Sequence, residues 1–148
     1  MTTMAKFSEK FKIKELKIYE TDYWIWSLRP HQTTLGAGIL SLKRECSNFS
    51  ELNQEEYSDL NNIIKVIEKT LKKTFNYDIM NYLMLMMVDK QVHYHVIPRY
   101  EKEFEIFGRV WKDRSWPGIP KLNEENLEGN LLVTVCNYIK NNLVVKLN

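Results

Sequence analysis

A chain of 148 residues is close to the commonest size of one domain and long enough to bury a hydrophobic core. Its 44% hydrophobic and 27% charged residues exclude a disordered chain, and a net charge of +2 is too small to predict specific nucleic-acid binding. The longest apolar run, from Tyr82 to Val88, is too short to span a bilayer. We therefore expect a single soluble domain over residues 1–148, with no membrane partner.

The cysteines and the first residues bear on the cellular compartment. Cys46 and Cys136 lie far apart in the sequence and match no metal-ligand spacing. The opening "MTTMAKFSEKFK" is polar and lysine-rich and lacks the apolar core of a secretory leader. Both observations favour a cytoplasmic location.

The first half of the chain predicts strands followed by a long helix. Aromatic and β-branched residues from Leu16 to Leu28 indicate one or two strands, which Arg29-Pro30 closes. The loop "HQTTLGAG" leads to a further strand over Gly38 to Arg44. A capping-box pattern of Asn53 with Glu56 then begins a helix whose apolar residues recur every three or four positions as far as Phe75.

The second half predicts a hairpin, a further strand and a second helix. Met80 to Val88 is almost entirely apolar, as expected of a central strand buried on both faces. Only Asp89-Lys90 separates it from the next strand, which indicates a tight antiparallel hairpin. "EFEIFGRVW" (103–111) reads as another strand, and the spacing from Leu131 to Leu143 fits an amphipathic helix. The predicted fold class is α+β, with a largely antiparallel sheet of about five strands, a long helix over about 53–75 and a C-terminal helix.

The segment "KQVHYHVIPR" (90–99) contains two of the three histidines of the chain. Because successive side chains of a strand point to opposite faces, Gln91, His93 and His95 share one face. We expect these three side chains to line one exposed cleft, while Val92, Tyr94 and Val96 pack on the other side.

Three hypotheses account for the two histidines. They could decorate a sheet face, although a row of glutamine and two histidines needs polar partners if it is buried. They could chelate a metal ion together with His31, although no cysteine or carboxylate stands at a ligand spacing. They could also carry out nucleophilic catalysis at phosphorus, with one neutral imidazole attacking and the other assisting the leaving oxygen.

The sequence resembles the histidine triad (HIT) superfamily. "QVHYHVIPR" is similar to its signature of three histidines that alternate with apolar residues, and the "HVIPR" ending is most like the fragile-histidine-triad and dinucleoside polyphosphate hydrolase branch. Upstream, "GAGILSLKRECSNFSEL" is placed like the strand that leads to the long helix of the family. The resemblance covers roughly Leu16 to Tyr100 and implies a HIT-like fold.

By this resemblance His93 matches the nucleophile, which attacks the α-phosphorus and becomes a nucleotidyl-imidazole. His95 matches the third histidine, which contacts the phosphate and the bridging oxygen. Gln91 stands where the first triad histidine is expected. In the family the backbone carbonyl of that position holds the N–H of the nucleophile, and any residue supplies such a carbonyl.

Two further positions depart from the family pattern. The glycine-rich phosphate loop that normally precedes the triad has no counterpart, because the predicted turn is only Asp89-Lys90, and Ala37 replaces a histidine that follows a glycine. Candidate phosphate- and substrate-binding residues are therefore Arg29, Ser27 and Arg99, together with Gln91.

The sequence thus predicts a hydrolase or nucleotidyl transferase that cleaves a nucleoside phosphoanhydride, phosphoramidate or phosphate ester, such as a dinucleoside polyphosphate, through His93 and His95. The site itself requires no cofactor or metal. The family resemblance implies a homodimer. The alternatives are a nucleotide-binding module with weak or no turnover, and a metal protein with histidine ligands.

Overall fold

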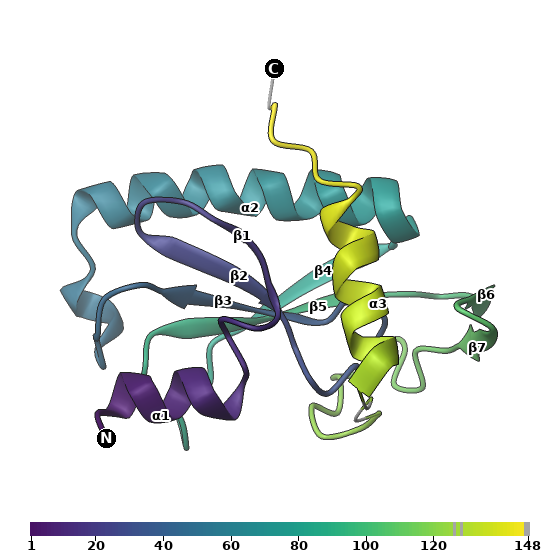
Figure 1. The fold of residues 1–148 in the computed structure, drawn as a ribbon, viewed down its shortest axis with the longest axis horizontal. Helices are drawn as coiled ribbons and strands as arrows, with labels where there is room; N and C mark the ends of the chain where they lie inside the picture. The colour runs from purple at the N-terminus through teal and green to yellow at the C-terminus, as the bar shows by residue number, and fades with distance from the viewer. Residues whose placement is uncertain (126, 128, 147–148) are drawn as a thin grey trace.

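The computed structural model describes residues 1–125, 127 and 129–146, and these form an α+β fold around a mostly antiparallel sheet (Figure 1). The sheet has five strands in the order β1-β2-β3-β5-β4. Its strands are β1 Lys17–Glu20, β2 Trp24–Leu28, β3 Gly38–Leu42, β4 Ile79–Leu83 and β5 His93–Arg99. The helices are α1 Thr3–Lys10, α2 Gln54–Phe75 and α3 Gly129–Lys140, with a 3₁₀ turn η1 at Phe49–Glu51. The predicted fold class is confirmed.

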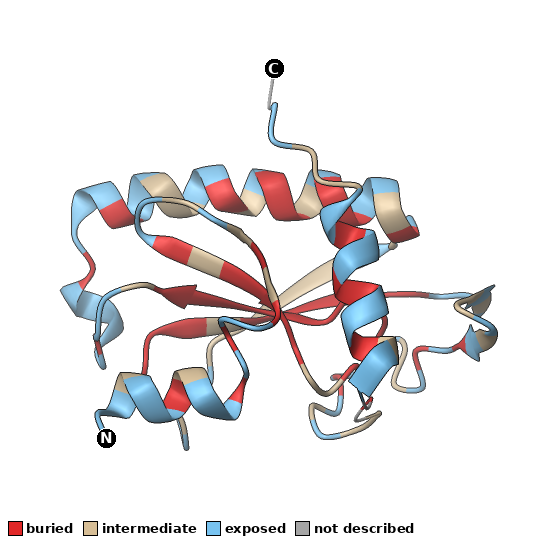
Figure 2. Ribbon diagram, in the orientation of Figure 1, coloured by how far each residue is buried: buried red, intermediate tan, exposed pale blue. Residues whose placement is uncertain are grey.

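The two faces of the sheet are covered by different helices. α2 crosses one face and α1 lies against the other, while α3 packs against β1 and α2 (Figure 1). Successive side chains of the central strands point to opposite faces of the sheet. Trp24, Trp26 and Leu40 belong to the large core beneath α2, and Ile39 belongs to a small cluster beneath α1. β3 is buried along its whole length, as Figure 2 shows.

α2 begins and ends where its sequence requires. The Asn53 side chain accepts a hydrogen bond from the backbone N–H of Glu56, and the Glu56 carboxylate accepts one from the N–H of Asn53, which completes a capping box. Asn76 ends the helix in the left-handed conformation, with φ 51°. The predicted helix over 53–75 is therefore confirmed. The predicted C-terminal helix is also present, as α3.

The predicted tight hairpin is wrong. β4 ends at Leu83, and residues 84–92 form a loop before β5 begins at His93. At the end of this loop Val92 hydrogen-bonds on the β3 side: Leu42 N–H donates to Val92 O, and Val92 N–H donates to Cys46 O. β4 is an edge strand, so the apolar run is not buried on both faces. Met87 and Val88 are each 81% exposed.

The segment predicted as one further strand is a hairpin of two strands, β6 Phe104–Ile106 and β7 Arg109–Trp111. Phe107 and Gly108 form its two-residue turn with φ values of 55° and 72°. A turn with positive φ at both central residues reverses the chain direction and matches the right-handed twist of the two strands that it connects. Gly108 accepts it without strain.

Sequence analysis did not predict α1. Its first turn is capped by Thr2, whose hydroxyl accepts a hydrogen bond from Ala5 N–H at 3.0 Å. Phe7 is buried within it, and Phe11 follows four residues later on the same side. None of the described helices is long and apolar enough to cross a membrane.

A buried ion pair gives the first prediction, which concerns stability. Arg99 donates to Asp113 through Nε at 2.7 Å and Nη2 at 3.2 Å, and both side chains are almost fully buried. Asp113→Ala leaves the Arg99 charge buried without its partner, so we expect the free energy of unfolding to fall by about 3–5 kcal/mol. Urea titration measures this change. Glu124→Ala removes an exposed, long ion pair with Lys121 and is the control, with a change within about 0.5 kcal/mol. A loss below about 1 kcal/mol for Asp113→Ala would contradict the prediction.

Candidate active site

Strand β5 presents His93 and His95 to the face of the sheet that α1 covers. His93 lies opposite Ser41 of β3, and His95 lies opposite Ile39. Val92 and Val96 belong to the core on the other face, and Tyr94 packs against it. The predicted division into two faces is therefore confirmed for residues 92–96, while the Gln91 side chain does not join the two histidines in the cavity.

The histidines are less exposed than predicted. His93 is 2% and His95 is 6% exposed, because the end of α1 packs on them. The Phe7 ring lies 4.8 Å from the His93 ring, and the Phe11 ring lies 6.1 Å from the His95 ring, centroid to centroid. The prediction of an open cleft is corrected to a covered one.

The two imidazoles nevertheless line a cavity of about 360 Å³. One wall comes from the end of α1, with Lys10 and Phe11, and a second from Arg29 and His31 after β2. The remaining walls are the loop segment 85–89 and residues 122–123. Loop 84–92 thus occupies the place before the histidines where the sequence analysis expected no room for a loop. Its side chains towards the cavity are mostly apolar.

A contact with a backbone carbonyl determines which ring nitrogen of His93 carries the proton. His93 Nδ1 lies 2.5 Å from the backbone carbonyl oxygen of Gln91. A carbonyl oxygen only accepts hydrogen bonds, so Nδ1 carries the proton and Nε2 keeps its lone pair. Burial lowers the pKa of His93, and the bond to Gln91 opposes that effect in part. Neutral imidazole with a free Nε2 is the nucleophilic form.

Arg29 contacts the second histidine. Its Nε–H donates to His95 Nδ1 at 3.2 Å, and its Nη1 donates to the carbonyl oxygens of His31, at 3.2 Å, and of Leu122. Burial lowers the pKa of Arg29 to about 10. Arg29 is 3% exposed and forms no ion pair with a carboxylate of the described residues. A buried cation without a counter-ion favours an anionic ligand.

Gln91 is corrected from a substrate-binding residue to a structural one. Its side chain is fully buried and satisfies three backbone groups: it accepts from Cys46 N–H at 3.1 Å and donates to Leu42 O and Arg44 O at 3.0 and 2.7 Å. It does not line the histidine cavity. Its contribution to the site is the backbone carbonyl that holds His93.

The predictions of Ser27 and Arg99 as substrate-binding residues are also corrected. The Ser27 hydroxyl donates to Ile13 O at 3.0 Å, beneath the chain that follows α1, and does not reach the cavity. Arg99 lies at the other end of β5, where it binds Asp113, Asn81 Oδ1 and Gly118 O. Of the predicted residues, the fold brings together His93, His95 and Arg29.

His31 also lines the cavity, although the sequence suggested it only as a metal ligand. Burial and the charge of Arg29 lower its pKa, and its Nδ1 is buried without a hydrogen-bond partner. Within the described ranges, no three His, Cys, Asp or Glu side chains gather in a way that could hold a metal ion. The described residues therefore provide no three-ligand cluster that supports a metal site at His31, His93 and His95.

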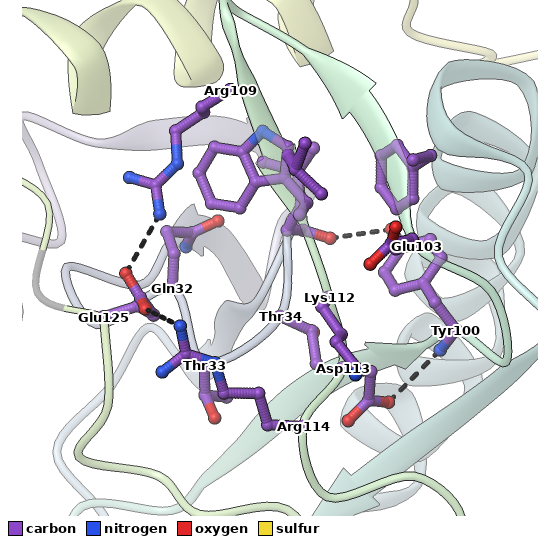
Figure 3. A pocket seen from close by; sticks show the side chains of 14 residues that line it. Gln32, Thr33, Thr34, Tyr100, Glu103, Arg109, Lys112, Asp113, Arg114 and Glu125 are labelled. Carbon is purple, nitrogen blue, oxygen red and sulfur yellow. Dashed lines mark hydrogen bonds and ion pairs between the residues drawn. The ribbon is translucent and has the colours of Figure 1, made fainter.

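A second cavity, of about 260 Å³, lies between residues 32–35 and the β6–β7 hairpin (Figure 3). Arg109 and Arg114 both bind the Glu125 carboxylate there, at 3.1 and 3.6 Å. Asp113 pairs with Arg99. Because these charges compensate one another, this cavity lacks the unpaired buried cation that distinguishes the histidine cavity.

Sequence analysis did not predict several of the residues that line the histidine cavity. The signal for the α1 wall was present, because a Thr2 cap and aromatic residues at positions 7 and 11 are typical of a short amphipathic helix. Residues 122–123 carry no such signal. Only the long-range packing of their segment brings them to the site.

The chain belongs to the HIT family. The HIT domain model matches residues 10–102, more than half of the sequence. Proteins with this domain are nucleotide-binding hydrolases or transferases. Comparison with curated protein sequences yields no match.

Solved structures of histidine triad proteins share the fold. One from Sinorhizobium meliloti is 22% identical, with 89% of this chain and 93% of that chain covered and a TM-score of 0.68. A hypothetical histidine triad nucleotide-binding protein from Sulfolobus tokodaii is 17% identical, with 86% and 82% covered and a TM-score of 0.68. One from Marinobacter aquaeolei is 20% identical, with 89% and 92% covered and a TM-score of 0.67. At these identities the similarity establishes the fold.

His95 gives a prediction for the pH dependence of stability. Burial, with smaller contributions from Arg29, His93 and Lys10, lowers its pKa from 6.5 to about 3. Between these values the unfolded chain binds a proton that the folded chain does not, so stability falls as the pH falls below 6.5. From pH 7.5 to 5 we expect His95 to remove about 2 kcal/mol from the free energy of unfolding.

Urea unfolding at several pH values measures this loss. His95→Gln keeps a side-chain acceptor for Arg29 but does not titrate, so its stability should depend less on pH over the same range. Equal losses in the wild type and in His95→Gln would show that His95 is not the titrating group.

Proposed function

We propose that this protein is a nucleotide hydrolase or nucleotidyl transferase that acts through a covalent nucleotidyl-histidine on His93. The observation that carries the proposal is the contact of His93 Nδ1 with the Gln91 carbonyl, at 2.5 Å, in a cavity that also contains an unpaired buried guanidinium. The first feature supports a nucleophile, and the second supports an anionic substrate. Substrates of this kind are nucleoside phosphoanhydrides, phosphoramidates or phosphate esters, with dinucleoside polyphosphates as the leading candidates.

The reaction proceeds in two displacements. His93 Nε2 forms a bond to the α-phosphorus while the bond from phosphorus to the leaving group breaks, and the leaving group departs with the bonding electron pair. The imidazolium adduct keeps its Nδ1–H on the Gln91 carbonyl. Water then attacks the same phosphorus, the P–N bond breaks, neutral His93 is restored, and the proton of the water passes to solvent. An alcohol or phosphate in place of water makes the enzyme a transferase.

Arg29 replaces the missing glycine-rich loop as the main phosphate contact. Its Nη2 donates no hydrogen bond to any described residue, so it is free to bind a phosphate oxygen. Lys10, at the rim, adds a second positive charge, although it pairs with Asp89 at 2.8 Å. The apolar side chains of loop 84–92 supply a surface for the nucleoside.

A binding module without turnover is the second candidate. The observation that favours it is the burial of His93 beneath Phe7, because the Phe7 ring covers part of the imidazole and restricts the approach of a substrate. A module would bind nucleotide and form no adduct.

The third prediction separates these two functions. Incubation with diadenosine tetraphosphate labelled at the α-phosphorus should give turnover and an acid-labile adduct on the wild-type protein. His93→Asn should form no adduct and lose turnover by at least about 1,000-fold, as expected for removal of the nucleophile. Mass spectrometry and acid lability identify the adduct.

Tyr57→Phe, a change on the exposed side of α2, is the matched control and should keep full activity. Nucleotide binding by the wild type with neither turnover nor adduct would establish the binding module. Turnover of His93→Asn within about tenfold of wild type, a barrier change of only about 1.4 kcal/mol, would exclude His93 as the nucleophile.

We also infer a homodimer, as the family resemblance implies. The unpaired edge of β4 supports it, since an exposed edge strand readily pairs with a second copy. Beside this edge lies an apolar groove with Ile79 and Ile119, which are 52% and 85% exposed.

The fourth prediction follows from this groove. Sedimentation analysis should give a mass about twice the 17.7 kDa of the chain, and Ile79→Lys should reduce it to that of a monomer by placing a charge in the interface. Val133→Lys, on the exposed side of α3, should leave the dimer intact. A monomeric wild type would refute the inference.

A further inference from the structure

We propose that Arg29, in addition to its phosphate contact, positions His95 as a neutral imidazole with its N–H on Nε2, and that the site therefore selects anhydrides over phosphoramidates and alkyl esters. This inference rests on the proposed function and narrows its substrate class. Its basis is the hydrogen bond from Arg29 Nε–H to His95 Nδ1, at 3.2 Å.

The donor in this bond is unambiguous. A guanidinium Nε always carries a hydrogen and never accepts, so His95 Nδ1 must accept. The single proton of the neutral imidazole then lies on Nε2. His93 has the opposite arrangement, with its proton on Nδ1 and a lone pair on Nε2. The two rings, 5.0 Å apart, therefore offer a nucleophile and a hydrogen-bond donor side by side.

Arg29 is held rigidly in this role. Its backbone N–H donates to Ala37 O at 2.9 Å, and its Nη1 is anchored on the carbonyls of His31 and Leu122.

A neutral His95 stabilises charge but does not deliver a proton readily. Protonation at Nδ1 would break the bond to Arg29 and place two cations in contact within a buried site. The other charged or titratable groups that face the pair are His93 on β5, His31 after β2, Lys10 on α1 and Asp89 on loop 84–92. Burial lowers the pKa of His95 to about 3, in agreement with this geometry.

The leaving group then decides which substrates react. A phosphate leaving group, whose conjugate acid has a pKa of about 6, departs as an anion and needs only the Nε2–H donor. An alkylamine, with a pKa of about 10, and an alkoxide must receive a proton as the bond breaks. Without an imidazolium to supply it, the P–N or P–O bond of these substrates breaks slowly.

The test compares two substrates with the same adenylyl group, diadenosine tetraphosphate and an adenosine alkylphosphoramidate, in wild type, Arg29→Met and Arg29→Lys. We expect the wild type to prefer the anhydride by about 100-fold or more in kcat/KM. Arg29→Met should lose about 100-fold on the anhydride, as for removal of a charged donor. The preference of Arg29→Met for the anhydride should be smaller than that of the wild type and should narrow further as the pH falls, because loss of the Arg29 charge raises the pKa of His95 and lets a larger fraction of the ring bind a proton. Arg29→Lys keeps the charge and should recover part of the anhydride activity.

Nitrogen NMR of the imidazoles is a readout independent of activity. In the wild type His95 should show its proton on Nε2 and stay neutral down to pH 5, and in Arg29→Met the pKa of His95 should rise, because the charge of Arg29 no longer opposes protonation while the burial remains. Arg114→Met, whose side chain is 69% exposed, is the control and should change neither readout.

A proton on Nδ1 of wild-type His95, or an equal preference in wild type and Arg29→Met, overturns the inference alone. Equal wild-type rates on both substrates also overturn it while leaving the nucleotidyl-histidine intact. Absence of turnover and adduct with every substrate removes the proposed function, and the inference with it.

Discussion

The buried guanidinium of Arg29 is the constraint on which the rest of the site depends. A cation enclosed by protein and without a carboxylate partner creates a positive field that water screens only weakly. Burial lowers the pKa values of His31 and His95, and the charge of Arg29 lowers them further. The hydrogen bond from Arg29 to His95 Nδ1 also orients the His95 ring, because it fixes which ring nitrogen can face a ligand.

α1 completes this environment by excluding water. Phe7 and Phe11 cover the rings of His93 and His95, and Lys10 forms an ion pair between the end of the helix and Asp89 on loop 84–92. A covered cavity strengthens every electrostatic interaction inside it. The ion pair between Lys10 and Asp89 is largely exposed on the lysine side, with 51% of that side chain accessible, so opening it costs little.

Gln91 stands where the family signature has its first histidine, and its backbone and side chain make separate contributions to the structure. The backbone carbonyl of Gln91 contacts His93 Nδ1, and every residue at this position would supply that carbonyl. Its side chain has a different role, because it satisfies one N–H and two carbonyl groups of residues 42–46, at and after the end of β3. A carboxamide has both donors and an acceptor for this purpose, and an imidazole has fewer.

The sequence by itself determined the local features. Strand alternation put His93 and His95 on one face, and the Asn53 cap with its apolar spacing placed α2, because these patterns depend on neighbours a few residues away. Only the tertiary structure decided that β4 is an edge strand, that Arg29 reaches His95, and that Ser27 and Arg99 are engaged elsewhere. Those outcomes depend on contacts between residues far apart in the chain, such as Arg29 with His95 and Arg99 with Asp113. Their polar atoms bind whatever partner the packing brings within reach, and no local pattern specifies that partner.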